Sequence, residues 1–262
     1  MDSPNVEERL VRVAVLDTET TGLEAFDEPI SIGLVLLSVR LPKGEIESEL
    51  SRYYGLRRPN VPIHPQAQAI HGISIHSLAG LDFDYDTVCT ILNQADYIIA
   101  HYAEFDKRML GKVLEKVSDK TWICSVKNIY WSDFIDVRDR KLDTLCQHFN
   151  VPRDSPHNAL SDTVALVSVL GNRSGATNRS RTYLGHAIMR APTTFSTNSR
   201  IAAKSPKPAA EFIQKSPERL RREAYSAPWI PPKQKRTQTR PGEIVFWVIV
   251  FVVCAILGLS RK

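Results

Sequence analysis

Apolar runs in the first half of the chain predict the strands of a sheet. Residues 11–17 are rich in Val, residues 29–39 begin with a proline, and residues 46–54 partly alternate between apolar and polar positions. A fourth apolar run, DYIIAHY, predicts a strand over 96–102. Three successive strands followed by helices that alternate with a strand favour an α/β fold with a sheet of mixed direction.

Helical periodicity dominates from residue 84 to residue 170. Between Phe105 and Val117 an apolar residue returns every fourth position, which is typical of an amphipathic helix. The prolines within residues 61–74 bound a short helical turn. We therefore predict helices over 84–95, 103–117, 141–150 and 158–170.

The pattern changes after Leu170, where Ser, Thr, Pro and Arg become frequent and no periodicity is evident. Residues 1–172 carry 17 Lys and Arg against 25 Asp and Glu, whereas 173–240 carry 15 against 3. We expect an acidic domain over 1–172 and a basic, mostly disordered linker over 173–243, with one short helix after Ser216-Pro217. The linker is a solvated spacer, a patch for anionic lipid headgroups, or a nucleic-acid tether.

Residues 244–259, IVFWVIVFVVCAILGL, are uncharged and almost wholly apolar. A helix of this length spans about 24 Å against roughly 30 Å of hydrocarbon, and flanking residues can snorkel. We predict a transmembrane tail anchor over 244–260; the alternative is a buried strand or core helix. Basic residues are more numerous before the run than after it, which predicts that the N-terminal domain lies in the cytoplasm.

The remaining composition agrees with a cytosolic compartment. The N-terminus is charged and does not resemble a signal peptide. The four cysteines form no CxxC pair, so we expect reduced thiols, with Cys124 and Cys146 in the core.

Two carboxylates stand at the end of the first strand. Asp17 and Glu19 are two residues apart, so their side chains share one face of the strand. Two converging anions are costly unless a cation lies between them, and hard oxygen ligands suit Mg²⁺ or Mn²⁺. Acidic residues beside a turn are also ordinary, so the pair alone is weak support for a metal site.

Two further segments carry residues of the same chemistry. Asp106 lies in the first turn of the helix that follows the fourth strand; alternatively, it stabilises that helix terminus. His157 and Asp162 are about 140° apart on a helical wheel, so we expect His157 on the loop and Asp162 on the helix. Taken alone, His157 is also compatible with a surface or capping role.

The order and spacing of these motifs resemble those of the DEDDh group of DnaQ-like 3′–5′ exonucleases, which includes polymerase proofreading subunits and exonuclease X-type enzymes. The resemblance covers roughly residues 9–171 and implies a ribonuclease H-like fold. The matching segments are DTETTGL (17–23), IHGIS (70–74), AHYAEFD (100–106) and HNALSD (157–162).

The resemblance implies a catalytic site that holds two Mg²⁺ or Mn²⁺ ions. Asp17, Glu19 and Asp162 would bind one ion, and Asp17 and Asp106 the other. His157 would take the proton from the attacking water, since neutral imidazole is available near physiological pH.

The same motifs imply substrate contacts. Thr20, Thr21 and Gly22 would bring backbone N–H and hydroxyl groups to the 3′ end, and Leu23 is either a wedge under the terminal base or a core residue. In the second motif His101 is usually followed by Asn, and here Tyr102 stands in that place. Tyr102 is able to stack on a base or ribose instead.

The sequence therefore predicts a 3′–5′ exonuclease that releases 5′-mononucleotides and is held on a membrane. Its expected substrate is the single-stranded or frayed 3′ end of DNA, with a DNA polymerase or repair complex as a candidate partner. One alternative is an exoribonuclease of the same fold. The other is a catalytically silent scaffold that binds nucleic acid at the membrane.

Overall fold

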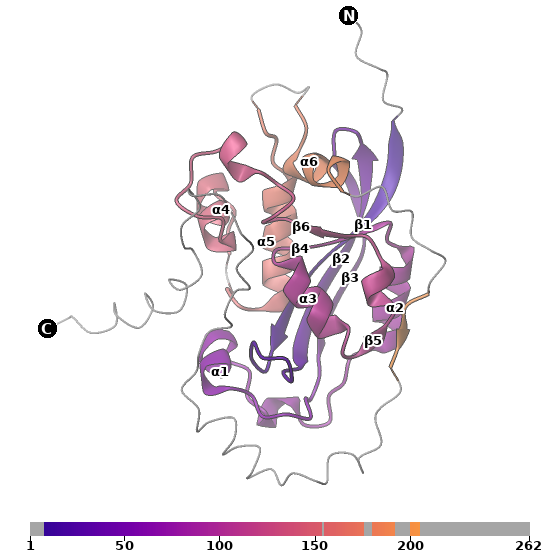
Figure 1. The fold of residues 1–262 in the computed structure, drawn as a ribbon, viewed down its shortest axis with the longest axis vertical. Coiled ribbons are helices and arrows are strands. Elements are labelled where there is room, and N and C mark those ends of the chain that lie inside the picture. The colour runs from indigo at the N-terminus through magenta and orange to yellow at the C-terminus, as the bar shows by residue number, and fades with distance from the viewer. Residues whose placement is uncertain (1–7, 154, 176–179, 192–199, 205–262) are drawn as a thin grey trace, which may run out of the picture. The chain divides into compact units, whose positions relative to one another are not determined.

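A five-stranded mixed sheet organises the protein (Figure 1). The computed structural model describes residues 8–153, 155–175, 180–191 and 200–204, all within the unit Met1–Pro208. The strand order is β3-β2-β1-β4-β6, with β1–β2 and β2–β3 antiparallel and β1–β4 and β4–β6 parallel. This order confirms the predicted ribonuclease H-like mixed sheet. The strands are β1 (Arg9–Thr20), β2 (Pro29–Leu41), β3 (Glu45–Leu56), β4 (Tyr97–Ala100) and β6 (Trp122–Cys124).

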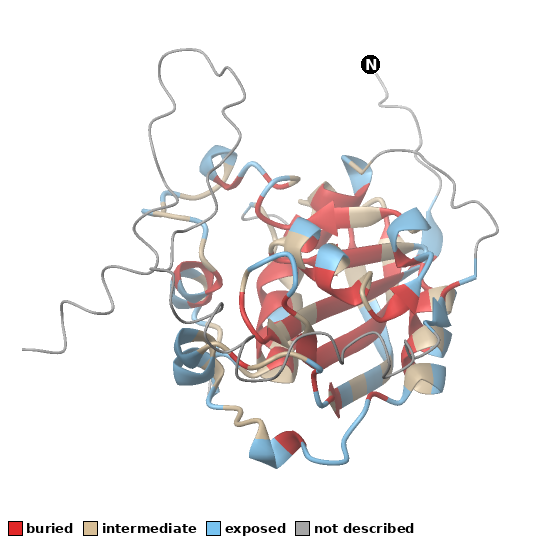
Figure 2. Ribbon diagram, turned by 60° about the horizontal axis from the view of Figure 1, so that its bottom comes forward, coloured by how far each residue is buried: buried red, intermediate tan, exposed pale blue. Residues whose placement is uncertain are grey.

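Helices cover both faces of the sheet because β1 is apolar on both sides. Val13 and Val15 face a core that includes α4 (Leu142–Phe149) and α5 (Ala159–Gly171). Ala14 and Leu16 face the opposite core, which includes α2 (Tyr85–Gln94) and α3 (Ala103–Leu110). In Figure 2 the sheet and the inner sides of these helices are buried. The buried Cys124 and Cys146 confirm their predicted place in the core.

Short elements connect this framework. The predicted helical turn within residues 61–74 is α1 (Pro65–His71), which is capped by Gly72 in the left-handed conformation. The other short elements are η1 (His76–Leu78), β5 (Leu114–Glu115), η2 (Val117–Asp119), η3 (Trp131–Asp133), α6 (Tyr183–Met189) and β7 (Ala202–Ala203).

The helix predicted over 103–117 is wrong in its second half. α3 ends at Leu110, followed by Gly111, a residue of low helix propensity. Val113 and Val117 are buried as their spacing suggested, but they belong to an irregular segment in which β5 pairs with β7. The apolar period persists beyond the helix because the segment still runs over the same core.

The domain boundary predicted at residue 172 also differs from the structure. α6 lies inside the segment expected to be a disordered linker, and its Tyr183, Leu184 and Ala187 are buried in the α5-side core. Thr182 caps the helix by accepting from the Gly185 N–H at 3.0 Å. Seven helical residues are too few to show a clear apolar period in a segment rich in Ser, Thr and Arg, so the sequence pattern did not predict this helix.

The helix predicted after Ser216, the rest of the linker and the predicted transmembrane segment lie outside the described residues. Within the part of the chain that the structure describes, no helix has both the length and the apolar character needed to cross a membrane.

Candidate active site

The end of β1 presents acidic and hydroxyl side chains to opposite faces of the sheet. Asp17 and Glu19 continue the face of Val13 and Val15 and are half-buried. Thr18 points to the other face and donates a hydrogen bond to Asp106 Oδ1 at 2.8 Å. The strand thereby fixes the directions of two carboxylates and, through Thr18, positions a third.

Asp162 reaches the same region because α5 begins directly against β2. Asn158 caps the helix by accepting from the Ser161 N–H at 3.1 Å, which places Asp162 in the first turn. Gly33, which pairs with Asp17 across the strands, allows the close approach: a Cβ there would lie 2.3 Å from the Ala159 carbonyl oxygen. A side chain at position 33 would push Asp162 away from Asp17.

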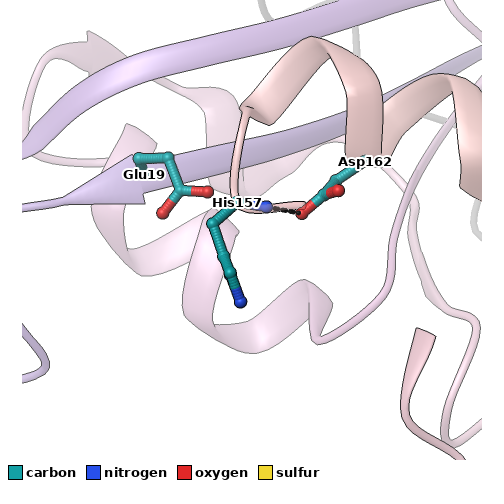
Figure 3. Close-up of side chains that lie close together, drawn as sticks. All are labelled: Glu19, His157 and Asp162. Carbon is teal, nitrogen blue, oxygen red and sulfur yellow. Dashed lines mark hydrogen bonds between the residues drawn. The ribbon is translucent and has the colours of Figure 1, made fainter. Parts of the chain in front are cut away.

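His157 lies on the turn before α5, as predicted, and its side chain is exposed (Figure 3). Its backbone is left-handed, with φ of 63°, and its N–H donates to Asp162 Oδ2 at 3.1 Å. One carboxylate oxygen each of Glu19 and Asp162 and one imidazole nitrogen of His157 lie within 4.8 Å of one another. These three side chains are thus close enough to share one ion or one water molecule.

Asp106 lies in the first half of α3, where its side chain is buried. Burial raises its pKa to about 7, although the Thr18 hydrogen bond lowers it. Burial, together with the charges of Asp162 and Asp106, raises the pKa of Glu19 to about 8. Burial likewise raises the pKa of Asp17, followed by the charges of Asp106, Glu19 and Asp162.

The charges of Asp106 and Asp162 raise the pKa of both Asp17 and Glu19, so these carboxyl groups lie near enough to repel one another. Such a set of hard, anionic oxygen donors fits divalent ions such as Mg²⁺ and Mn²⁺. Bound divalent charge would relieve the repulsion that raises the pKa values of Asp17 and Glu19. The residues present therefore fit the predicted metal site.

The structure adds Arg153, which the sequence analysis did not single out. Its Nε and Nη2 donate to the two oxygens of Asp162 at 2.7 and 2.6 Å, and its Nη1 pairs with Asp143. Its charge lowers the pKa of both Asp17 and Glu19. A single Arg four residues before His157 has no periodicity or motif to mark it, so only the fold reveals its role.

The loop after β1 is more internally bonded than predicted. The Thr20 hydroxyl donates to the Gly22 carbonyl at 2.7 Å, and the Thr21 hydroxyl donates to Asp27 Oδ1 at 2.7 Å. A Cβ on Gly22 would meet the Asp27 carboxylate at 2.6 Å. Both hydroxyl hydrogens therefore serve this loop, and the contact of Thr20, Thr21 and Gly22 with a 3′ end stays a prediction.

Leu23 is half-buried on this loop, between the two roles predicted for it. Arg108 of α3 donates to the carbonyl oxygens of Leu23 and Glu24, each at 3.0 Å. The helix that carries Asp106 thus also holds the loop that carries Leu23.

His101 is also predicted to bind substrate. It is buried, and its Nδ1 lies 2.8 Å from the Ser125 Oγ. Burial lowers its pKa to about 4, so it is a neutral residue of the interior. Tyr102 is half-buried against the α3-side core with its ring centroid 5.1 Å from that of His101; its stacking on a substrate stays a prediction.

The chain is similar to several known proteins. A family model described as exonuclease matches residues 14–170. Exodeoxyribonuclease 10 of Escherichia coli K12 is 32% identical over 174 residues, which are 62% of this chain and 70% of that protein. The PolC-type DNA polymerase III of Bacillus subtilis is 26% identical over 162 residues, 60% of this chain and 11% of the polymerase. The solved structure "Exonuclease X in complex with 5′ overhanging duplex DNA" is 24% identical, covers 66% of this chain and 99% of that chain, and superposes with a TM-score of 0.47.

The family match spans more than half of the sequence, so the chain belongs to the exonuclease family. It is a 3′–5′ exonuclease, a phosphodiester hydrolase of the DnaQ-like kind that the motifs predicted. Enzymes of this family depend on divalent metal ions, in agreement with the acidic cluster.

Proposed function

We propose that this chain is a two-metal exodeoxyribonuclease that shortens DNA from its 3′ end and releases 5′-mononucleotides. The observation that carries the proposal is that ligand atoms of Glu19 on β1, Asp162 on α5 and the exposed His157 lie within 4.8 Å of one another. Asp17 on β1 and Asp106 on α3 lie near enough for their charges to interact with this group. These groups come from distant parts of the chain, and each is positioned by a specific backbone or side-chain contact.

Asp17, Glu19 and Asp162 would hold one ion, and Asp17 and Asp106 the other. When bound, the ions supply charge that stabilises the attacking and leaving oxygens of the phosphodiester. The protein contributes rigidity: Asp17 and Glu19 belong to an internal strand, and Thr18 fixes Asp106 at 2.8 Å. Mg²⁺ is the expected ion, with Mn²⁺ able to replace it.

His157 acts as the general base that removes a proton from the attacking water. Its side chain is exposed on a turn, so it is able to move toward a bound phosphate, while its backbone N–H stays tied to Asp162. Removal of a general base costs typically about 10²- to 10⁴-fold in rate.

DNA is the proposed substrate class because the relative that is 32% identical is an exodeoxyribonuclease. The segment of residues 20–23 would meet the terminal nucleotide through Gly22 and the half-buried Leu23, because the Thr21 N–H already donates to the Glu28 carbonyl oxygen at 2.9 Å. Tyr102 would add stacking contacts to a base or sugar.

The test is digestion of 3′- and 5′-labelled DNA and RNA oligonucleotides by the full chain in Mg²⁺, Mn²⁺ or EDTA. We expect stepwise shortening of DNA from the 3′ end that stops in EDTA, in Asp17→Asn and in His157→Ala. His148→Ala is the matched control, because His148 is also exposed but lies at the far end of α4. Shortening from the 5′ end, or full activity in His157→Ala, would contradict the mechanism. Faster shortening of RNA than of DNA would contradict the DNA assignment and favour an exoribonuclease.

We also propose that residues 244–260 anchor the protein in a membrane, with the catalytic domain in the cytoplasm. Support comes from the uncharged apolar run and the basic residues that precede it. Full-length protein should float with membranes in a density gradient, and protein truncated after residue 243 should not. Flotation of the truncated protein would contradict the anchor.

Association with a DNA polymerase or repair complex stays a prediction. The Bacillus subtilis relative is itself a DNA polymerase, which makes a polymerase the first partner to test by co-purification.

A further inference from the structure

Arg153 is a buried cation that occupies a proposed metal ligand. The guanidinium binds both oxygens of Asp162 in the side-on, two-bond geometry that is specific to Arg and carboxylate. The side chains of Arg153 and Asp162 are only 10% and 6% exposed. Because the His157 N–H also donates to Asp162 Oδ2, neither oxygen of this carboxylate is without a partner.

This arrangement suits a protein without metal. Taking one partner from a buried ion pair leaves an uncompensated charge and is strongly destabilising. Here Asp162 would otherwise add its charge to those of Asp17, Glu19 and Asp106. Arg153 offsets part of that repulsion, but it uses the oxygens that a divalent ion would need.

The position of Arg153 in the chain allows it to serve two carboxylates. It lies on the loop between α4 and α5, so a shift of its side chain requires no change in either helix. Asp143, in the first turn of α4, already pairs with Nη1 and is 55% exposed. Asp143 therefore provides a second place for the guanidinium, nearer to solvent than Asp162.

We propose that Arg153 is a positioning residue that takes the place of a divalent ion on Asp162 in the metal-free protein and withdraws to Asp143 when the ion binds. This inference rests on the proposed function, since it takes Asp162 as a metal ligand. Arg153 competes with the metal and thereby sets the ion concentration at which the site fills.

The competition predicts opposite effects of two substitutions. In Arg153→Gln the competing cation is lost, so Mn²⁺ should bind more tightly. We expect the affinity to rise about tenfold, a size typical of two coupled binding equilibria. In Asp143→Asn the second resting place loses its charge, so Arg153 should stay on Asp162 and Mn²⁺ should bind more weakly. Arg153→Lys keeps the charge without the two-bond geometry and should give an affinity between those of wild type and Arg153→Gln.

The experiment is calorimetric titration of the full chain with Mn²⁺ alone, without nucleic acid, together with melting temperatures in EDTA and in Mn²⁺. We expect Arg153→Gln to melt at a lower temperature than wild type in EDTA. Addition of Mn²⁺ should raise its melting temperature by more than it raises that of wild type. The control is Arg57→Gln, which removes an equally buried Arg paired with Glu28 at 2.8 Å. Arg57→Gln should lower both melting temperatures and leave the Mn²⁺ affinity unchanged.

Unchanged or weaker Mn²⁺ binding in both Arg153 variants would overturn the inference and make Arg153 a fixed support of Asp162. If Arg153→Gln does not fold, the Arg153→Lys and Asp143→Asn affinities decide the question, because they are expected on opposite sides of wild type. Failure of the proposed function would look different: wild-type protein would neither bind Mn²⁺ nor degrade DNA, whatever residue 153 is.

Discussion

At the residue scale, the site is a group of acidic side chains, and a different structural feature positions each part of it. Asp17 and Glu19 were predictable because the alternation of a strand puts residues two apart on one face. Asp106 and Asp162 were located by motif spacing, but their geometry depends on Thr18 and on the Asn158 cap. The role of Arg153 was not predictable, because its pairing with Asp162 depends on the path of a loop and not on a repeating sequence pattern.

The raised pKa values predict how the metal-free protein responds to pH. The pKa of Glu19 is about 8 in the folded protein against an ordinary value of 4.5, so the folded state holds more protons between these values. The contribution of Glu19 to stability without metal should therefore be most favourable at low pH and fall as pH rises from about 4.5 to about 8. Melting temperatures of wild type and Glu19→Gln in EDTA at pH 5, 6.5 and 8 test this.

The quantity to compare is the difference in melting temperature between wild type and Glu19→Gln at each pH. The low pKa of His101 acts in the opposite direction below about pH 6.5, but it acts equally in both. Wild type should lose stability relative to Glu19→Gln as the pH rises. A constant difference across the range would contradict the assignment of an unfavourable buried charge to Glu19.

At the element scale, the site depends on how closely α5 approaches the sheet. Gly33 of β2 contacts the first turn of α5, and the Thr163 hydroxyl donates to the Gly33 carbonyl at 3.1 Å. The strand pattern predicted β2, and the apolar spacing predicted α5. Nothing in either pattern showed that residue 33 must be small, because that need arises from contact between elements far apart in sequence.

Gly33→Ala should therefore reduce both stability and activity. Its methyl group would lie 2.3 Å from a backbone carbonyl oxygen that has little freedom to move. Overpacking of this kind costs typically about 1–3 kcal/mol, and we expect a larger loss of nuclease activity than of melting temperature because Asp162 is displaced. Gly175→Ala, at an exposed position, is the control; equal behaviour of the two variants would contradict the close contact.

α6 makes a second prediction at this scale. Leu184 is fully buried in the α5-side core, so Leu184→Ala should destabilise the protein by about 2–5 kcal/mol. Met189, at the end of the same helix, is 42% exposed, so Met189→Ala should change stability by less than about 0.5 kcal/mol. Chemical denaturation measures both, and a neutral Leu184→Ala would support the shorter domain expected from composition.

At the scale of the whole molecule, a sheet of predictable strands carries a site that is only partly predictable. The strands and most helices follow from apolar patterns because each buries a regular face against the sheet. The short α6 and β7 were not predicted, because their stability comes from packing on a core formed by residues earlier in the chain. Both belong to the unit Met1–Pro208, so protein ending at residue 172 would lack part of its core.

The central claim is that Asp17, Glu19, Asp106 and Asp162 bind divalent metal beside His157. Anomalous diffraction from crystals grown with Mn²⁺ and a short DNA oligonucleotide tests it most directly. We predict anomalous peaks among these four carboxylates, with the guanidinium of Arg153 on Asp143. Peaks elsewhere, or an empty cluster in protein that still degrades DNA with Mn²⁺, would contradict the account.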